Sequence, residues 1–216
     1  MNIPFYKRLL SFLYPVCIER RSSPFHPVLD LYLHRNQWQL ATEDAFYSDG
    51  KRYRPLLAAF KKIRRELATA HHVLVLGTGL ASAVHILEHM GFHPVYTLVD
   101  IDEAVLGLAI ELMPRHHLPR IEAVCMDAQL FMQQNTHRYP LIVCDVFIGR
   151  DVPDFVSSVI FLEQCKTSLQ PGGRFILNYL EKSKSLYRDM CRLMDHVYPG
   201  YTRIEFGINK IFVASA

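Results

Sequence analysis

A glycine-rich turn in the first half of the chain has residue types suited to holding a ligand. Four apolar residues, VLVL, lead into Gly77-Thr78-Gly79, and a segment with helical character follows at once. Glycine lets the backbone approach a ligand closely, and the N–H groups at the start of a helix bind anionic or polar groups. The turn predicts a site for a nucleotide-like ligand, although a tight strand-to-helix turn in any α/β protein would use glycine too.

Three aspartates end or directly follow later apolar runs, in phase with this turn. Asp100 closes YTLVD, Asp127 follows IEAVCM, and Asp145 closes YPLIVCD. Ligands of open α/β sheets bind beyond the carboxyl ends of the strands, where a carboxylate after the second strand can accept both hydroxyls of a ribose. Asp127 is placed to accept from the amino group of an adenine. The pattern therefore predicts a nucleoside-binding crevice, with Asp145 at the end of a strand that borders it.

Helix capping is the alternative role for acidic residues at strand ends. In LVDID the capping role fits Asp102 better than Asp100, which leaves Asp100 for the ribose. For Asp127 the two roles can coexist, because one carboxylate has two oxygens.

Alternating strand-like and helix-like segments must position these residues. The predicted strands are residues 73–77, 95–100, 121–125, 140–145 and 174–179. The predicted helices are residues 81–90, 103–112, 154–168 and 185–197. Continuous apolar strands that alternate with helices indicate a parallel sheet covered on both faces. The tail, YTRIEFGINKIFVAS, is typical of two antiparallel strands around a Gly207–Lys210 turn. The predicted fold is α/β: a doubly wound, Rossmann-like sheet ending in an antiparallel hairpin, a shape that resembles the methyltransferase sheet of class I.

A smaller N-terminal region precedes this sheet. Residues 28–48 alternate in polarity around HRNQ and predict a β-hairpin, and residues 1–21 are interpreted as an N-terminal helix. Residues 53–70 predict a further helix, whose apolar stripe has helical spacing and consists of Leu56, Phe60, Ile63 and Leu67. We therefore expect two domains, residues 1–52 and residues 53–216.

Composition narrows the class of protein. A net charge of +3 on 216 residues is too weak to indicate nucleic-acid binding, and no stretch approaches the roughly 20 apolar residues that span a bilayer. The five cysteines lie far apart, without the paired spacing of a metal site, and predict free thiols in a reducing cytoplasm. An apolar hairpin and helix outside a complete sheet predict a homodimer.

Several of these segments resemble the spermidine synthase-like branch of the S-adenosylmethionine-dependent methyltransferase superfamily, over nearly the whole chain. VLVLGTGLAS is similar to V-L-x-x-G-G-G-D-G-G, LVDID to V-E-I-D, and MDAQLFM to G-D-A/G-x-x-F. YPLIVCDVFIGRDVP resembles the Y-D-V-I-x-x-D-x-x-D loop, and LQPGGRFILN resembles L-x-P-G-G-x-L-x-x-N. The resemblance implies that S-adenosylmethionine or its decarboxylated form is bound by the domain of residues 53–216.

The resemblance also assigns roles to particular residues. It implies a cofactor site made of Gly77, Thr78, Gly79, Asp100, Ile101, Asp127, Ala128, Asp145 and Gln39. In the N-terminal segment Gln39, Leu40 and Tyr47 match the family's Q-L … Y-H-E pattern. The candidate catalytic residues are Asp145, Asp151 and Tyr47.

Three departures from the family pattern affect the predicted reaction. Ile148 stands where the loop has its second aspartate, Leu80 replaces the aspartate of the glycine-rich turn, and Ser48-Asp49 replaces His-Glu. An aliphatic side chain cannot accept a proton from an attacking amine. Asp151 and Asp49 are candidates to compensate, although a surface charge and a turn residue are their alternative interpretations.

Methyl transfer makes lighter demands on the protein, because the sulfonium already activates the methyl group and positioning supplies much of the rate. The carboxylate of the cofactor could meet the N–H of Gly79, with no aspartate at Leu80 to repel it. We therefore expect a methyltransferase that acts on a small, cationic acceptor. The alternatives are an aminopropyltransferase and a non-catalytic adenosyl-binding or assembly module. A nicotinamide-dependent dehydrogenase would not explain Asp127 or the terminal hairpin.

Overall fold

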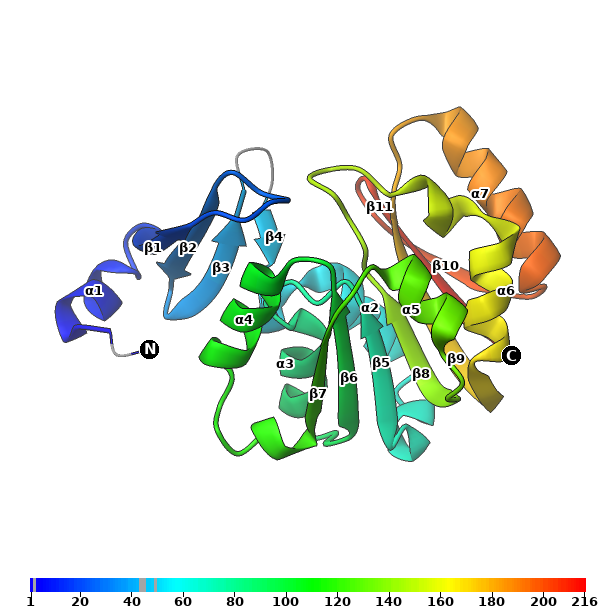
Figure 1. Cartoon of the computed structure of the whole chain (residues 1–216), viewed down its shortest axis with the longest axis horizontal. Coiled ribbons are helices and arrows are strands. Elements are labelled where there is room, and N and C mark those ends of the chain that lie inside the picture. Colours follow the sequence, from blue (N-terminus) through cyan, green and yellow to red (C-terminus); the bar gives the residue numbers. More distant parts are fainter. Residues whose placement is uncertain (2, 43–45, 49) are drawn as a thin grey trace.

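The larger of two sheets carries most of the chain. The computed structural model describes residues 1, 3–42, 46–48 and 50–216 (Figure 1). The order of its seven strands is β10-β11-β9-β8-β5-β6-β7. Their bounds are β5 (His72–Leu76), β6 (Val95–Asp100), β7 (Ile121–Cys125), β8 (Tyr139–Cys144), β9 (Leu169–Leu180), β10 (Thr202–Phe206) and β11 (Asn209–Ser215). β11 pairs antiparallel with both β10 and β9, and the other described pairs of this sheet are parallel. The predicted Rossmann-like sheet with a terminal hairpin is confirmed.

Helices cover both faces of this sheet. One core lies under α2 (Arg54–Lys62), α3 (Ser82–His89) and α4 (Glu103–Leu112). The other lies under α5 (Ala128–Gln134), α6 (Val159–Thr167) and α7 (Lys184–Val197). Along β5 the side chains alternate between the two, since Val73 and Val75 belong to the first core and Leu74 and Leu76 to the second. This period of two explains why a fully buried strand has a continuous apolar run.

Two helices are shorter than the predicted ranges, residues 53–70 and residues 154–168. In the first, α2 ends at Lys62 and the chain resumes as a 3₁₀ turn at Glu66–Thr69, although all four stripe residues are buried. In the second, a 3₁₀ turn at Asp154–Ser157 precedes α6. There the Ser158 hydroxyl accepts from the Phe161 N–H at 3.2 Å, which caps the helix and sets its start. Another 3₁₀ turn, Leu118–Arg120, leads into β7.

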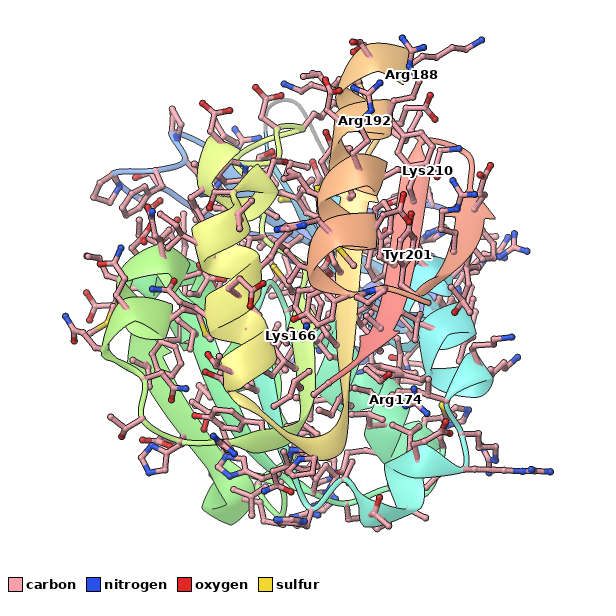
Figure 2. All side chains as sticks on the ribbon, turned by 90° about the vertical axis from the view of Figure 1, so that its right-hand side faces the viewer. Lys166, Arg174, Arg188, Arg192, Tyr201 and Lys210 are labelled. Atoms are coloured by element: carbon pink, nitrogen blue, oxygen red, sulfur yellow. The ribbon has the colours of Figure 1, made fainter. Side chains whose placement is uncertain are left out.

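Charged side chains on the terminal hairpin and on β9 form ion pairs, and Figure 2 shows where Lys210 and Arg174 lie. Lys210 on β11 lies 3.0 Å from Glu181, beyond β9, and 3.1 Å from Glu205 on β10. Arg174 at the start of the ladder pairs with Glu66 at 2.7 Å. Lys210 thus links β11 to β10 and to the residue that follows β9, and Arg174 links β9 to the 3₁₀ turn at Glu66–Thr69.

The N-terminal region forms a second sheet. After α1 (Phe5–Leu10) come β1 (Val16–Arg21), β2 (Leu29–His34), β3 (Gln37–Ala41), β4 (Phe46–Ser48) and a 3₁₀ turn, Gly50–Arg52. The predicted hairpin is β2 with β3, joined by Arg35 and Asn36, whose φ angles of 51° and 58° are typical of a type I′ turn. The helical interpretation of residues 1–21 is wrong beyond Leu10, because the segment after Pro15 pairs with β2 as an additional strand.

This small sheet packs against the large one at α4. Leu29, Leu31 and Leu40 share a buried cluster with Val105 and Leu108 of the helix. Figure 1 shows the small sheet beside α4, on the side of the large sheet where β6 ends. The boundary proposed between residues 52 and 53 stays a prediction. Within the described part of the chain, no helix combines the length and apolarity needed to cross a membrane.

Candidate functional site

The glycine-rich turn connects the carboxyl ends of three adjacent strands. The N–H of Gly77, just after β5, donates to the carbonyl of Val99 on β6 at 2.9 Å. Gly77 has a φ of +79°, and a Cβ added there would lie 2.4 Å from the carbonyl oxygen of Asp145, after β8. Only glycine therefore fits at this position, and the turn and Asp145 are packed directly against each other.

Asp100 binds the turn itself. Its Oδ2 accepts from the N–H groups of Thr78 at 2.9 Å and Gly79 at 3.3 Å, and its Oδ1 accepts from the Asp102 N–H at 3.0 Å. Burial raises the pKa of Asp100 above its ordinary value, against the lowering effect of these three donors. The N–H groups expected to meet a cofactor carboxylate are thus already bonded to a carboxylate of the protein.

Asp127 caps α5 and lines a pocket beside the glycine-rich turn. Its Oδ1 accepts from the N–H groups of Gln129 at 2.8 Å and Leu130 at 3.0 Å. Both Asp127 and Ala128 line the pocket. The capping role weighed for Asp127 is therefore present, and the position still allows a contact with a bound base.

Asp145 is held by two residues that were not among the predicted site residues, Asn178 and Tyr53. The amide of Asn178, on β9, donates to Asp145 Oδ1 at 2.7 Å and to the Tyr53 hydroxyl at 2.6 Å. Burial raises the pKa of Asp145 to about 6, while hydrogen bonds from Asn178 and Tyr53 lower it. The Asn178 Oδ1 atom is buried without a hydrogen-bond partner. Asn178 ends the FILN segment quoted above, so a signal for it was present; Tyr53 carried no signal of its own.

One pocket collects most of the predicted cofactor residues. Its lining includes Gly77, Thr78, Gly79, Asp100, Ile101, Asp127, Ala128 and Asp145, all predicted. It also includes residues that were not predicted, among them Phe25, His26, Leu56, Phe147, Ile148 and Phe155. The described lining residues carry three carboxylates and neither lysine nor arginine. Their ligand-binding roles stay predictions that this arrangement favours.

Two predicted residues, Asp151 and Gln39, are not brought to the pocket. Asp151 forms an ion pair with Lys182 and is 62% exposed at its side chain, and it is absent from the lining. Gln39, on β3 opposite Tyr32, is also absent from the lining. Tyr47 lies on β4, but its side chain falls outside the described part of the chain, as does Asp49 altogether. The ammonium group of Lys182 gives the Asp151 carboxylate a partner outside the pocket.

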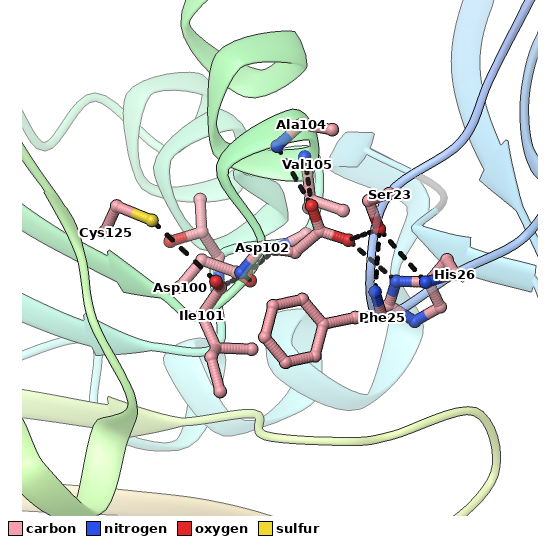
Figure 3. Close-up of polar contacts among 11 residues, drawn as sticks. Ser23, Phe25, His26, Asp100, Ile101, Asp102, Ala104, Val105 and Cys125 are labelled. Atoms are coloured by element: carbon pink, nitrogen blue, oxygen red, sulfur yellow. Dashed lines mark hydrogen bonds and ion pairs between the residues drawn. The ribbon is translucent and has the colours of Figure 1, made fainter.

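The N-terminal region supplies one wall of the pocket (Figure 3). Asp102, the residue that caps α4, also accepts from the Ser23 hydroxyl and from His26 Nδ1, the latter at 2.9 Å. Phe25 and His26 line the pocket beside Ile101. The two sheets therefore meet at a buried carboxylate next to the site.

The strand order with one reversed strand and the glycine turn over a row of aspartates define the class I S-adenosylmethionine-dependent methyltransferase-like fold. A profile of the spermine/spermidine synthase domain matches residues 52–206. The chain belongs to the spermine/spermidine synthase family.

Individual relatives agree with this assignment. The polyamine aminopropyltransferase of Enterobacter sp. (strain 638) is 28% identical over 140 residues, which are 60% of this chain and 47% of that protein. The chain thus spans about half the length of the curated relatives that it matches. A probable spermidine synthase from Corynebacterium glutamicum superimposes with a TM-score of 0.73 at 20% identity, covering 94% of this chain and 80% of that one. Spermidine synthase from Thermotoga maritima gives 0.71 at 16%, covering 92% and 72%.

These comparisons correct the expected activity. The methyltransferase prediction is wrong, because the family and the curated relatives are those of aminopropyltransferases. The prediction rested on the missing acidic residues and on the lighter demands of methyl transfer, with a cofactor carboxylate bound by the Gly79 N–H as a further argument. In the structure that N–H donates to Asp100 instead.

Proposed function

We propose that the chain transfers the aminopropyl group of decarboxylated S-adenosylmethionine to a small amine. The family supports this activity, and its relatives include polyamine aminopropyltransferases. The observation that carries the proposal is the carboxylate of Asp145, held by Asn178 and Tyr53 against the glycine-rich turn. A proton acceptor and an adenosyl pocket thus lie side by side.

The charge of the pocket favours a dicationic donor. Asp100, Asp127 and Asp145 line it, whereas decarboxylated S-adenosylmethionine carries a sulfonium and an ammonium group and no carboxylate. A donor that kept its carboxylate would bring a negative charge toward Asp100, which already occupies the N–H groups of Thr78 and Gly79. Without its positive charges the product, methylthioadenosine, would be held less strongly, which favours its release.

The chemistry requires one proton acceptor. The nitrogen of the acceptor amine attacks the carbon next to the sulfonium, a C–N bond forms, and the C–S bond breaks with its electron pair passing to sulfur. The proton lost by the nitrogen passes to the carboxylate of Asp145. With a pKa of about 6 this carboxylate is ionised at neutral pH and able to accept it.

A second candidate is a module that binds adenosyl compounds without turnover. Ile148 lines the pocket where a second carboxylate would help to hold an ammonium group, and Asp151 is paired with Lys182. Among the described residues this leaves Asp145 alone at the acceptor end of the pocket. The two candidates make the same prediction for binding and opposite predictions for turnover.

Calorimetric titration with four adenosyl compounds tests the donor. We expect decarboxylated S-adenosylmethionine and methylthioadenosine to bind about tenfold more tightly than S-adenosylmethionine and S-adenosylhomocysteine, a difference of about 1.4 kcal/mol. The opposite preference would contradict the proposal. Turnover is then measured as methylthioadenosine released with 1,4-diaminobutane.

Turnover by the wild-type chain separates the two candidates, and the Asp145→Asn variant tests the role of Asp145. Loss of the proton acceptor should lower kcat by about 100-fold or more, while binding of methylthioadenosine, which needs no base, persists. Wild-type binding without turnover for a series of mono- and diamines would favour the non-catalytic module.

A further inference from the structure

One wall of the pocket comes from a loop of the N-terminal region. Phe25 and His26 line the pocket together with Asp100 and Ile101. In Figure 3 the ring of Phe25 lies next to the side chain of Ile101. Phe25 is 43% exposed, so burial in a core does not hold its ring in place. Something else must fix the loop.

Hydrogen bonds close this loop on itself around Ser23. The Ser23 hydroxyl accepts from the N–H groups of Phe25 at 3.2 Å and His26 at 3.0 Å. The Ser23 N–H donates to the carbonyl of His26 at 2.8 Å. The loop is therefore a compact unit, and Ser23 is its hub.

One buried carboxylate anchors the unit to the large sheet. Asp102 is 1% exposed, and its Oδ2 accepts from both the Ser23 hydroxyl and His26 Nδ1. Burial raises the pKa of Asp102, but the hydrogen bonds from Ser23, His26 and two backbone N–H groups bring it below the ordinary value, so the group is charged.

The two oxygens of Asp102 have separate tasks. Oδ1 caps α4, accepting from the N–H groups of Ala104 at 2.9 Å and Val105 at 3.4 Å. Oδ2 holds the loop. Neither oxygen is needed for the other task, so the loop contact is an addition to an ordinary helix cap.

We propose that Asp102 is a positioning residue for the adenosyl donor. Through Ser23 it holds the ring of Phe25 against the pocket, where the ring packs on the adenosyl group next to Ile101. Asp102 then sets the affinity for the donor without contacting it. This inference rests on the proposed adenosyl pocket, and it adds Phe25 as a contact that the sequence did not indicate.

Titration of methylthioadenosine into loop variants tests the inference. Ser23→Ala removes the hydroxyl that bonds Asp102 and closes the loop, leaving only the His26 contact with Asp102, and Phe25→Ala removes the ring that the loop positions. We expect each to raise the dissociation constant about tenfold, and the double variant to be no weaker than Phe25→Ala alone, because the two changes act through one contact. Ser23→Thr, which keeps the hydroxyl, should restore most of the affinity.

A matched control distinguishes positioning from general destabilisation. Ser183 caps α7, accepting from the Leu186 N–H at 3.2 Å, and neither residue lines the pocket. Ser183→Ala therefore removes a comparable serine contact and should leave the dissociation constant unchanged. Unaltered affinity in Ser23→Ala, or additive losses in the double variant, would overturn the inference alone. Failure of the wild-type chain to bind any adenosyl compound would overturn the proposed function and this inference together.

Discussion

Gly77 is the residue at which the glycine-rich turn contacts Asp145 directly. An added methyl group would lie 2.4 Å from a backbone oxygen, at a φ of +79°. We expect Gly77→Ala to lower the free energy of unfolding by about 3 kcal/mol, the sum of a clash and an unfavourable backbone conformation. Urea denaturation measures the loss.

Gly91 provides the control for this substitution. Its φ is +86°, but a Cβ there would meet nothing within 4 Å. Gly91→Ala should therefore cost only the conformational term, about 1 kcal/mol. Equal losses in the two variants would show that the contact with Asp145 does not constrain residue 77.

The ionisation of Asp145 predicts how activity depends on pH. Burial raises its pKa to about 6, and the group accepts a proton only when ionised. Below that pKa kcat/KM should fall about tenfold per pH unit, and above it kcat/KM should level off. Tyr53→Phe keeps the ring but removes a hydrogen bond that lowers this pKa. The midpoint should then move up by about one unit. A midpoint that stays in place would exclude Asp145 as the titrating group.

At the scale of elements, the turn between β2 and β3 is not optimal. Arg35 has a φ of 51°, a conformation that costs a non-glycine residue about 1 kcal/mol and that asparagine tolerates better. Arg35→Asn should raise the free energy of unfolding by about 0.5 kcal/mol, measured by thermal or urea denaturation. Arg35→Ala keeps the strain and should give no gain; a similar gain with alanine would argue against the backbone explanation.

The central strands of the large sheet, β5, β6 and β8, were predictable because they are buried on both faces. The edge strand β7 is mostly exposed, and the apolar residues of IEAVC still indicated it. The bounds of β6 and β7 agree with the predicted residues 95–100 and 121–125. By contrast β1 is half-exposed along its length, so its apolar pattern is weak and its identity comes from pairing with β2. The residues of β1 alone do not reveal that β2 is its pairing partner.

The same limit applies to the site. The aspartates at strand ends were predictable, because the topology of a parallel sheet brings the ends of its strands together. The tyrosine beside Asp145 was not, because the sequence pattern indicated Tyr47 and gave no signal for Tyr53. Tyr53 is placed there by Asn178 on β9, which lies more than a hundred positions from Tyr53 in the sequence and bonds both Tyr53 and Asp145.

For the whole molecule, the exposed apolar surface around α1 predicts self-association. Phe5 is 80% exposed, Leu9 61% and Leu13 79%, and monomers rarely expose such a cluster. We predict a homodimer that buries this surface, with twice the 25.0 kDa of one chain by light scattering. Leu13→Glu should shift the mass to that of a monomer. Ile208→Glu, at a residue 60% exposed in the terminal hairpin, should not. A monomeric wild-type chain would contradict the prediction.

The anchor at Asp102 has a consequence for how the protein is made. Ser23 and His26 leave the ribosome well before their partner, which is encoded beyond two strands of the large sheet. Because chains are synthesised from the N-terminus at about 5–20 residues per second, the loop waits several seconds for the carboxylate that holds it. During that interval the apolar strands of the small sheet have no α4 to cover them. The nascent N-terminal region therefore exposes apolar strands until residue 112 has emerged, and we expect it to need protection from aggregation during that interval.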